Sequence, residues 1–204
     1  MGYAYYQQSD YEQAVKEFNK IIDGRNEVAQ NAYYHLAESY INLDQKTEAL
    51  NAFRNASQMD FDSKIQEDAW LNYAKLSYDI GNPYESVPAV LTNFLKTYPD
   101  SGFRAEIEDL LIDSYISSKN YEEALDLLKG KSGFENKKAF QKVAFYRGLE
   151  LYSESELNEA KEMFEKALTE PRDPFVHARS LFWLAETNYN LLDYNEALIG
   201  FKAV

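Results

Sequence analysis

Few residues of the chain have the types and spacing that catalysis or metal binding requires. The two histidines, His35 and His177, stand far apart in the sequence, and neither belongs to an HExxH motif or another metal-ligand spacing. The sequence contains no cysteine, which excludes disulfides, thiolate metal sites and cysteine nucleophiles. These residues therefore predict no enzyme, no bound metal and no other cofactor.

An acidic pair and a short glycine–lysine run are the remaining candidates for chemistry. Asp109 and Asp113 are four residues apart, so a helix would place both carboxylates on one face. A calcium or acid–base site is one interpretation, but no calcium-loop pattern accompanies the pair, and we favour a solvated acidic face. The run GKSG at residues 130–133 lacks both the spacing of a phosphate-binding loop and a preceding strand.

The composition favours a helical protein with a sizeable core. Hydrophobic residues make up 45% of the 204 positions and aromatic residues 15%, with only 8 Gly and 5 Pro to interrupt helices. The formal net charge is −13, which is the wrong sign for a nucleic-acid-binding protein. No apolar run approaches the roughly 18 residues that a membrane span needs.

A repeat organises the whole chain and supplies the elements that must position any site. One small residue recurs at intervals of 35 to 38 residues, at Ala14, Ala49, Val87, Ala124, Ala160 and Ala197. Each copy carries two apolar i, i+3, i+4 stripes, which predict two amphipathic helices. The sequence therefore predicts a series of about six helical hairpins.

The second copy shows the repeat most completely. It reads Tyr33-x2-Leu36-Ala37-x2-Tyr40, followed by Ala49-x3-Phe53. This pattern resembles the tetratricopeptide repeat, whose signature is W-x2-L-G-x2-Y…A-x3-F with a period of about 34 residues. The resemblance covers the chain and implies an all-α, right-handed α-solenoid, with the first and last hairpins incomplete. It also implies a single domain over residues 1–204.

Small residues in each hairpin predict where helices touch. Gly2, Ala37, Ala74, Gly148 and Ala185 occupy the same repeat position, where a small side chain lets two helices approach closely. Large side chains such as Phe53 and Phe164 are expected to fill the space between neighbouring hairpins. We expect Ala49 and Ala160 at helix contacts, and Ala32 one step off the core stripe.

The second helix of several copies has a recognisable start. An Asp or Asn precedes it, and Gln or Glu follows three residues later, which is the pattern of a capping box. The three pairs are Asp10 with Gln13, Asn120 with Glu123, and Asp193 with Glu196.

Three features depart from the standard repeat. The connector YPDS at residues 98–101 resembles a bacterial cell-envelope subtype, found in outer-membrane assembly lipoproteins and Tol–Pal accessory proteins. It implies a periplasmic or envelope-associated location rather than a cytoplasmic one. Residues 129–134 predict either a bend in the solenoid or a short helix with a tight loop. Both termini fall inside a repeat, so we expect a fragment of a longer array that self-associates weakly through its exposed ends.

The resemblance also implies a binding surface, because the first helices of successive tetratricopeptide repeats line a concave groove. Any of the groove positions could instead belong to the core of a hairpin. Copies two to four supply mostly acidic and amide groups, and copies five and six supply mostly aromatic groups. By register, the groove residues are Tyr34, Glu38, Asp68, Lys75, Asp109, Asp113, Tyr146, Tyr152, Phe182, Trp183 and Glu186.

The sequence thus predicts a protein–protein interaction scaffold that binds a peptide or a partner domain in its groove. The charge and the aromatic positions predict a partner segment with basic and apolar side chains, and no nucleic acid. The alternative is a structural spacer or self-association rod within a larger envelope protein.

Overall fold

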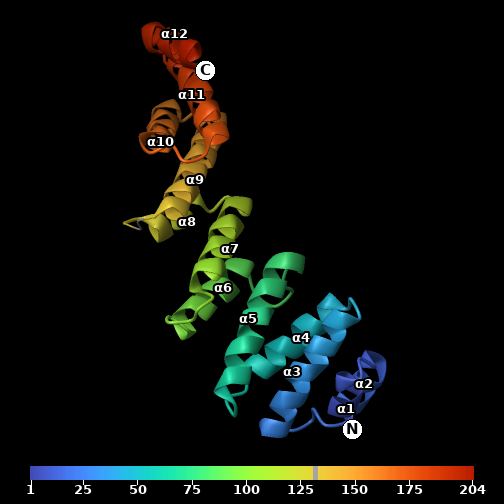
Figure 1. Ribbon diagram of the computed structural model, residues 1–204. Helices are drawn as coiled ribbons and strands as arrows, with labels where there is room; N and C mark the ends of the chain where they lie inside the picture. Colours follow the sequence, from blue (N-terminus) through green and yellow to red (C-terminus); the bar gives the residue numbers. More distant parts are fainter. Residues whose placement is uncertain (131–132) are drawn as a thin grey trace. The chain divides into compact units, whose positions relative to one another are not determined.

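Paired helices joined by short turns build the chain (Figure 1). The computed structural model describes residues 1–130 and 133–204, and these contain twelve helices and no strand. The helices are α1 (Gly2–Gln7), α2 (Tyr11–Phe18), α3 (Glu27–Asn42), α4 (Lys46–Ser57), α5 (Ser63–Ile80), α6 (Val87–Thr97), α7 (Arg104–Ser117), α8 (Tyr121–Leu128), α9 (Phe134–Ser153), α10 (Leu157–Thr169), α11 (Pro174–Asn190) and α12 (Tyr194–Ala203). The prediction of an all-α fold of successive helical hairpins is therefore confirmed.

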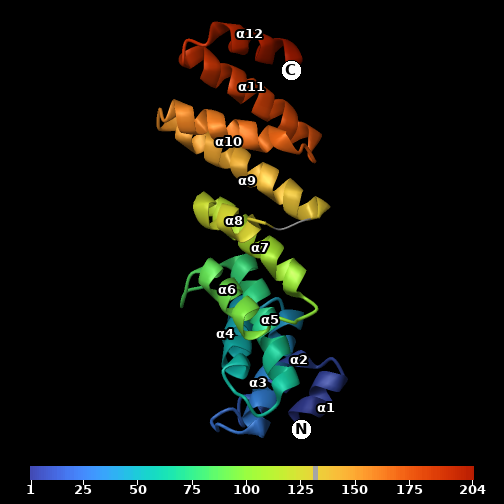
Figure 2. The same cartoon turned by 90° about the vertical axis from the view of Figure 1, so that its left-hand side faces the viewer.

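The chain forms two compact units, Met1–Leu111 and Ile112–Val204, with the boundary inside α7. In unit 1, α3 packs against both α2 and α4, and α4 packs against α5. In unit 2, α9 runs beside α10 and α11 beside α12 (Figure 2). The single domain over residues 1–204 and the bend near residues 129–134 stay predictions, and residues 131 and 132 lie outside the described residues.

A left-handed residue ends the first helix of most hairpins. In the third copy, α5 is capped directly by Gly81, with φ 80° and ψ 173°. In the other five copies φ is positive at the second residue after the helix, at Ser9, Asp44, Lys119, Ser155 and Leu192. The next backbone N–H donates to a carbonyl five residues back, as from Gln45 to Tyr40 at 2.9 Å and from Asp193 to Asn188 at 2.8 Å. This bond satisfies a carbonyl at the helix end and turns the chain into the second helix.

Only one of the three expected capping boxes has its side-chain bond. The Asp10 carboxylate accepts from the Gln13 backbone N–H at 3.2 Å, as predicted. Asn120 and Asp193 stand at the N-cap positions of α8 and α12, but in the described structure neither side chain makes a capping hydrogen bond. The prediction of a side-chain cap is therefore wrong at Asn120 and Asp193. Side-chain caps occur instead on the first helices α3, α5 and α11, from Asn26, Asp62 and Asp173.

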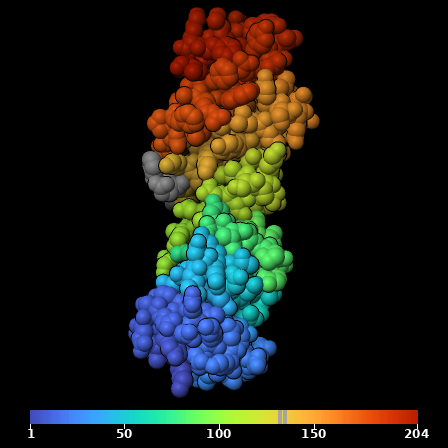
Figure 3. Space-filling view, turned by 90° about the vertical axis from the view of Figure 1, so that its right-hand side faces the viewer, coloured from blue at the N-terminus to red at the C-terminus, as the bar shows by residue number. Residues whose placement is uncertain are grey.

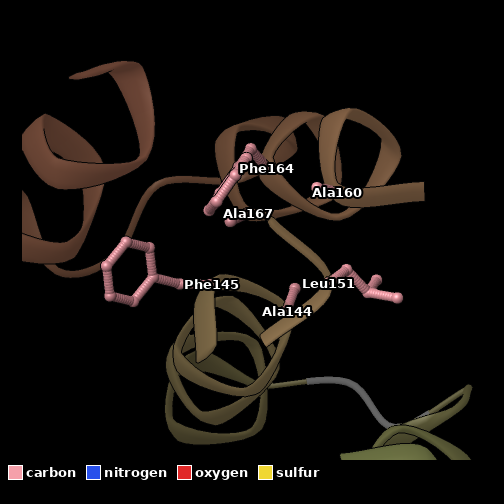
Figure 4. Packing of buried hydrophobic residues seen from close by; sticks show 6 residues of the cluster. All are labelled: Ala144, Phe145, Leu151, Ala160, Phe164 and Ala167. Atoms are coloured by element: carbon pink, nitrogen blue, oxygen red, sulfur yellow. The ribbon is translucent and has the colours of Figure 1, made fainter. Parts of the chain in front are cut away.

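Close packing between the two helices of a hairpin explains the recurring small residues. A Cβ atom added to Gly148 would lie 2.7 Å from Phe164 Cε1, and one added to Gly2 would lie 2.8 Å from Phe18 Cδ1. Phe164 therefore fills space within its own hairpin, between α9 and α10 (Figure 4). Phe164 belongs to a buried cluster against which Val176 of the following hairpin also packs. The sequence analysis expected Phe164 to fill only the space between hairpins, but the cluster that contains it lies both within its own hairpin and against the next one.

The expectation for Ala32 is wrong. Ala49 and Ala160 are fully buried as predicted, but Ala32 is also only 2% exposed. The reason is that α3 packs against α2 on one side and α4 on another, so its buried surface is wider than one stripe.

Two buried glutamines that the sequence analysis did not identify hold the connectors between hairpins. The Gln30 side chain accepts from the Asp62 backbone N–H at 2.7 Å and donates to the Met59 carbonyl at 2.7 Å. In unit 2, Gln141 accepts from the backbone N–H of Asp173 at 2.8 Å. Both glutamines stand 32 residues before the aspartate that caps the next first helix, so each fixes where that helix begins.

Candidate protein-binding surfaces

The first helices of unit 1 bring Tyr34 and Asp68 together. The Tyr34 hydroxyl on α3 donates to Asp68 Oδ2 on α5, and Asn72 Nδ2 donates to the same oxygen at 3.3 Å. Burial, the hydrogen bond to Asp68 and nearby Glu38 all raise the pKa of Tyr34, which keeps the hydroxyl protonated as a donor. These two predicted groove residues therefore join neighbouring first helices.

Glu38 belongs to a polar and aromatic cluster around His35. Its carboxylate lies 2.8 Å from His35 Nδ1. The rings of Tyr3 and Tyr6 each stand 5.1 Å from the His35 ring, so α1 supplies part of the cluster. Burial, followed by the charge and hydrogen bonding of Glu38, raises the pKa of Tyr6 to about 12. His35 is thus enclosed by aromatic rings, and within the described residues no three metal-ligating side chains gather there.

Lys75 and the acidic residues of α7 form connections between successive first helices. Lys75 Nζ lies 2.8 Å from Glu106 Oε1 and 5.0 Å from the centre of the Phe103 ring, both in unit 1. In unit 2, Lys142 Nζ on α9 donates to Asp113 Oδ1 at 2.8 Å. Asp109 is exposed on the part of α7 that belongs to unit 1.

These contacts change the description of the acidic positions. Glu38, Asp68 and Asp113 each already have a partner within the chain. The sequence analysis treated them as carboxylates open to an incoming basic segment. A basic side chain of a partner would have to compete with these internal partners.

Unit 2 brings two predicted aromatic residues into contact. Tyr152 on α9 and Trp183 on α11 meet edge to face, with ring centres 5.1 Å apart and planes at 68°. Asn190 Nδ2 donates to the Tyr152 hydroxyl at 2.9 Å, which fixes the ring from the far end. Both rings are half-buried, so one part of each remains accessible. We call Tyr152, Trp183 and Asn190 the aromatic pair surface.

The other three predicted groove residues of unit 2, Tyr146, Phe182 and Glu186, lie outside the contact between Tyr152 and Trp183. Tyr146 packs against two core clusters and meets Phe145 edge to face at 5.4 Å, so it belongs to the hairpin core. The ring centre of Phe182 lies 5.6 Å from that of Trp183 and 6.0 Å from that of Phe201 on α12. Phe182 therefore connects the aromatic pair surface to α12. Glu186 is half-buried on α11, and its backbone carbonyl accepts from Asn190 at 2.8 Å.

Arg179 is a further first-helix residue near this surface. Its guanidinium lies 4.8 Å from the ring centre of Phe145 and 5.4 Å from that of Phe175. Such cation–π contacts hold the arginine against α9 and the start of α11.

Comparison with known proteins gives a repeat assignment and a fold. Family models described as tetratricopeptide repeat match residues 1–23 and 30–63. No curated protein matches the chain. No helix among the described residues combines the length and the hydrophobicity of a membrane span.

Several solved structures are similar to the chain at low identity. The C-terminal part of a TPR repeat-containing protein from Cytophaga hutchinsonii is 15% identical, with a TM-score of 0.50, over 98% of this chain and 75% of that one. MamA of AMB-1 is 19% identical, with a TM-score of 0.49, over 87% and 90% of the two chains. Pseudomonas aeruginosa pilF is 20% identical, with a TM-score of 0.41, over 98% and 85%. The chain thus contains tetratricopeptide repeats at residues 1–23 and 30–63 and has an all-helical repeat fold similar to that of the Cytophaga protein.

Proposed function

We propose that the chain is a scaffold that binds a protein partner along its first helices, with the aromatic pair surface as the anchor. The observation that supports this is the fixed, half-exposed contact of Tyr152 with Trp183. Aromatic side chains bury large areas on binding and dominate binding energy at interfaces. Because Asn190 and Trp183 already hold the Tyr152 ring, little side-chain freedom is lost when a partner binds.

The charge of the chain supports a partner with basic and apolar side chains. The net charge of −13 attracts a basic segment over a distance and speeds its encounter with the chain. Because Glu38, Asp68 and Asp113 have internal partners, the carboxylates contribute to steering more than to tight contact. The apolar side chains of the partner would then meet Tyr152 and Trp183.

The test uses a partner recovered with the full-length protein and measures the rates of binding. Trp183→Ala should raise the off-rate, because it removes the anchoring ring. Asp109→Asn with Asp113→Asn should weaken the salt dependence of the on-rate. If Trp183→Ala leaves the off-rate unchanged, the aromatic pair surface is not the anchor.

A self-associating rod is the second candidate function, and the exposed face of α12 favours it. Leu198 and Ile199 are 55% and 61% exposed, whereas Leu50, which corresponds to Leu198 in the repeat, is 1% exposed because α5 covers α4. The space-filling view shows α12, in red, at the surface (Figure 3). A second copy could cover this apolar face. Sedimentation of Ile199→Glu against the unmodified chain tests this, since only the unmodified chain should associate as its concentration rises.

We also propose a periplasmic or envelope-associated location, and the connector at residues 98–101 supports it. Fractionation of cells that express the full-length protein would test the location. Recovery in the cytoplasmic fraction alone would contradict it.

A further inference from the structure

Unit 2 contains a cavity of about 310 Å³ between the end of α8, the first half of α9 and the last turns of α10. Leu128 and Gln141 are buried and Phe140 is half-buried. The Gln141 side-chain oxygen already accepts from the backbone N–H groups of Arg172 and Asp173, so Leu128 and Phe140 supply the apolar part of the lining. Lys129 and Lys166 are exposed and lie at the mouth. A cavity of this size lies at the lower end of the range of ligand pockets, roughly 300–1,000 Å³.

The charge at this cavity is opposite to that of the chain. Three lysines line it, at positions 129, 137 and 166, and Glu170 is the one acid among its described lining residues. The Glu170 carboxylate is already paired with Lys137 and, at 3.2 Å, with Arg172 Nη2. The hydrogen bond from Lys137 lowers the pKa of Glu170, so that carboxylate stays charged and committed to its partners.

Two of the lining cations remain available. Within the part of the chain that the structure describes, Lys129 and Lys166 form no ion pair. Among the described lining residues, three lysines face one acid, whereas the whole chain carries −13. The local potential therefore favours an anionic ligand.

We propose that this cavity, which we call the lysine pocket, binds an acidic peptide segment of a partner protein. One apolar side chain of the segment would enter against Leu128 and Phe140, and flanking carboxylates would meet Lys129 and Lys166. A simple anion would use the lysines and leave the apolar lining in water, while a purely apolar ligand would leave the lysines without partners. Only a ligand with both groups matches the whole lining.

The lysine pocket is distinct from the aromatic pair surface in residues and in ligand charge. Its lining comes from α8, α9 and α10, and it contains neither Tyr152 nor Trp183. The inference rests on the proposed function in one respect: it takes the ligand of the lysine pocket to be a segment of a protein partner. Binding at one surface can therefore fail while binding at the other succeeds.

The test measures fluorescence anisotropy of a fluorescein-labelled peptide of alternating Glu and Leu, added to the full chain. We expect saturable binding that weakens about tenfold in Lys166→Glu and in Lys129→Glu, because each change replaces an attraction with a repulsion. Lys138→Glu is the matched control, since Lys138 is exposed on α9, carries the same charge and does not line the cavity. That variant should change the affinity by no more than about twofold.

A second variant tests the cavity without changing its charge. Thr169 is exposed and lines the cavity, so Thr169→Trp should fill it and abolish binding while circular dichroism stays unchanged. A peptide in which Gln replaces Glu should bind at least about tenfold more weakly than the acidic peptide.

Four results would overturn the lysine pocket. They are the absence of saturable binding by the Glu–Leu peptide, equal losses in Lys138→Glu and Lys166→Glu, full binding by Thr169→Trp, and displacement of the peptide by equimolar inorganic phosphate. Trp183→Ala should leave this binding unchanged, so the experiment is independent of the test of the aromatic pair surface.

Discussion

Replacement of the buried Gln30 should destabilise unit 1 strongly. Gln30 is fully buried, and its amide joins α3 to the connector that leads into α5. The side chain accepts from the Asp62 backbone N–H at 2.7 Å and donates to the carbonyls of Met59 at 2.7 Å and Asp62 at 3.1 Å. Gln30→Leu keeps a similar volume and removes all of these bonds.

The size of the effect follows from the groups left without partners. A buried donor or acceptor that loses its partner costs about 1–3 kcal/mol. Gln30→Leu leaves one donor, the Asp62 N–H, and at least one acceptor, the Met59 carbonyl, in partly buried positions. We therefore expect a loss of about 2–4 kcal/mol in the free energy of unfolding, partly offset by the apolar side chain.

The assay is urea unfolding followed by circular dichroism, with hydrogen exchange to locate the change. Gln66→Leu is the control, because Gln66 is half-buried and donates a single long bond of 3.3 Å to the Ser57 carbonyl. It should cost less than about 1 kcal/mol. Exchange should accelerate in α3, α4 and α5 and stay unchanged in unit 2. Equal losses in the two variants would refute the reasoning.

Three further predictions concern packing, the turns and the response to pH. Gly148→Ala should cost about 1–3 kcal/mol in thermal or urea unfolding, because the added Cβ would lie 2.7 Å from Phe164, whereas Gly102→Ala meets nothing within 4 Å and should be nearly neutral. Leu192→Gly should raise the free energy of unfolding by about 0.5–1 kcal/mol, because Leu192 has a φ of 69° and glycine adopts that conformation without a clash. A lower free energy of unfolding in the variant would contradict this. The raised pKa of Tyr6, about 12, means that its contribution to stability is complete below the ordinary value of 10.0 and is lost as pH rises toward 12. Tyr6→Phe should therefore flatten the fall in stability over that pH range, and an unchanged profile would show that Tyr6 does not cause it.

The helices could be predicted because each hairpin repeats its pattern locally. The small residues at Ala49 and Ala160 recur at nearly constant spacing, and both are buried as expected. The missing caps at Asn120 and Asp193 could not be predicted, because the same residue pattern and the same left-handed turn at Ser9 and Asp10 do give a side-chain cap. The burial of Ala32 depends on packing by a preceding helix, which periodicity within one helix does not reveal.

The candidate site could be predicted only in part, since Asp68 and Asp113 have partners on a neighbouring repeat. Register placed Tyr152 and Trp183 on first helices, and the structure brings them together. It could not show that Asp113 pairs with Lys142, because that contact depends on the rotation of two helices about their axes. A signal for the buried glutamines did exist, since each precedes a helix-capping aspartate by 32 residues.

The most direct test of the scaffold proposal is site-specific photo-cross-linking of the full-length protein to its partner. A photoreactive phenylalanine would replace Tyr152 in one variant, and Glu162, which is exposed on α10, in a control. We predict a cross-linked partner from position 152 and little from position 162, and Trp183→Ala should abolish the first adduct. Cross-linking from position 162 alone would contradict the account and show that the partner binds the second helices.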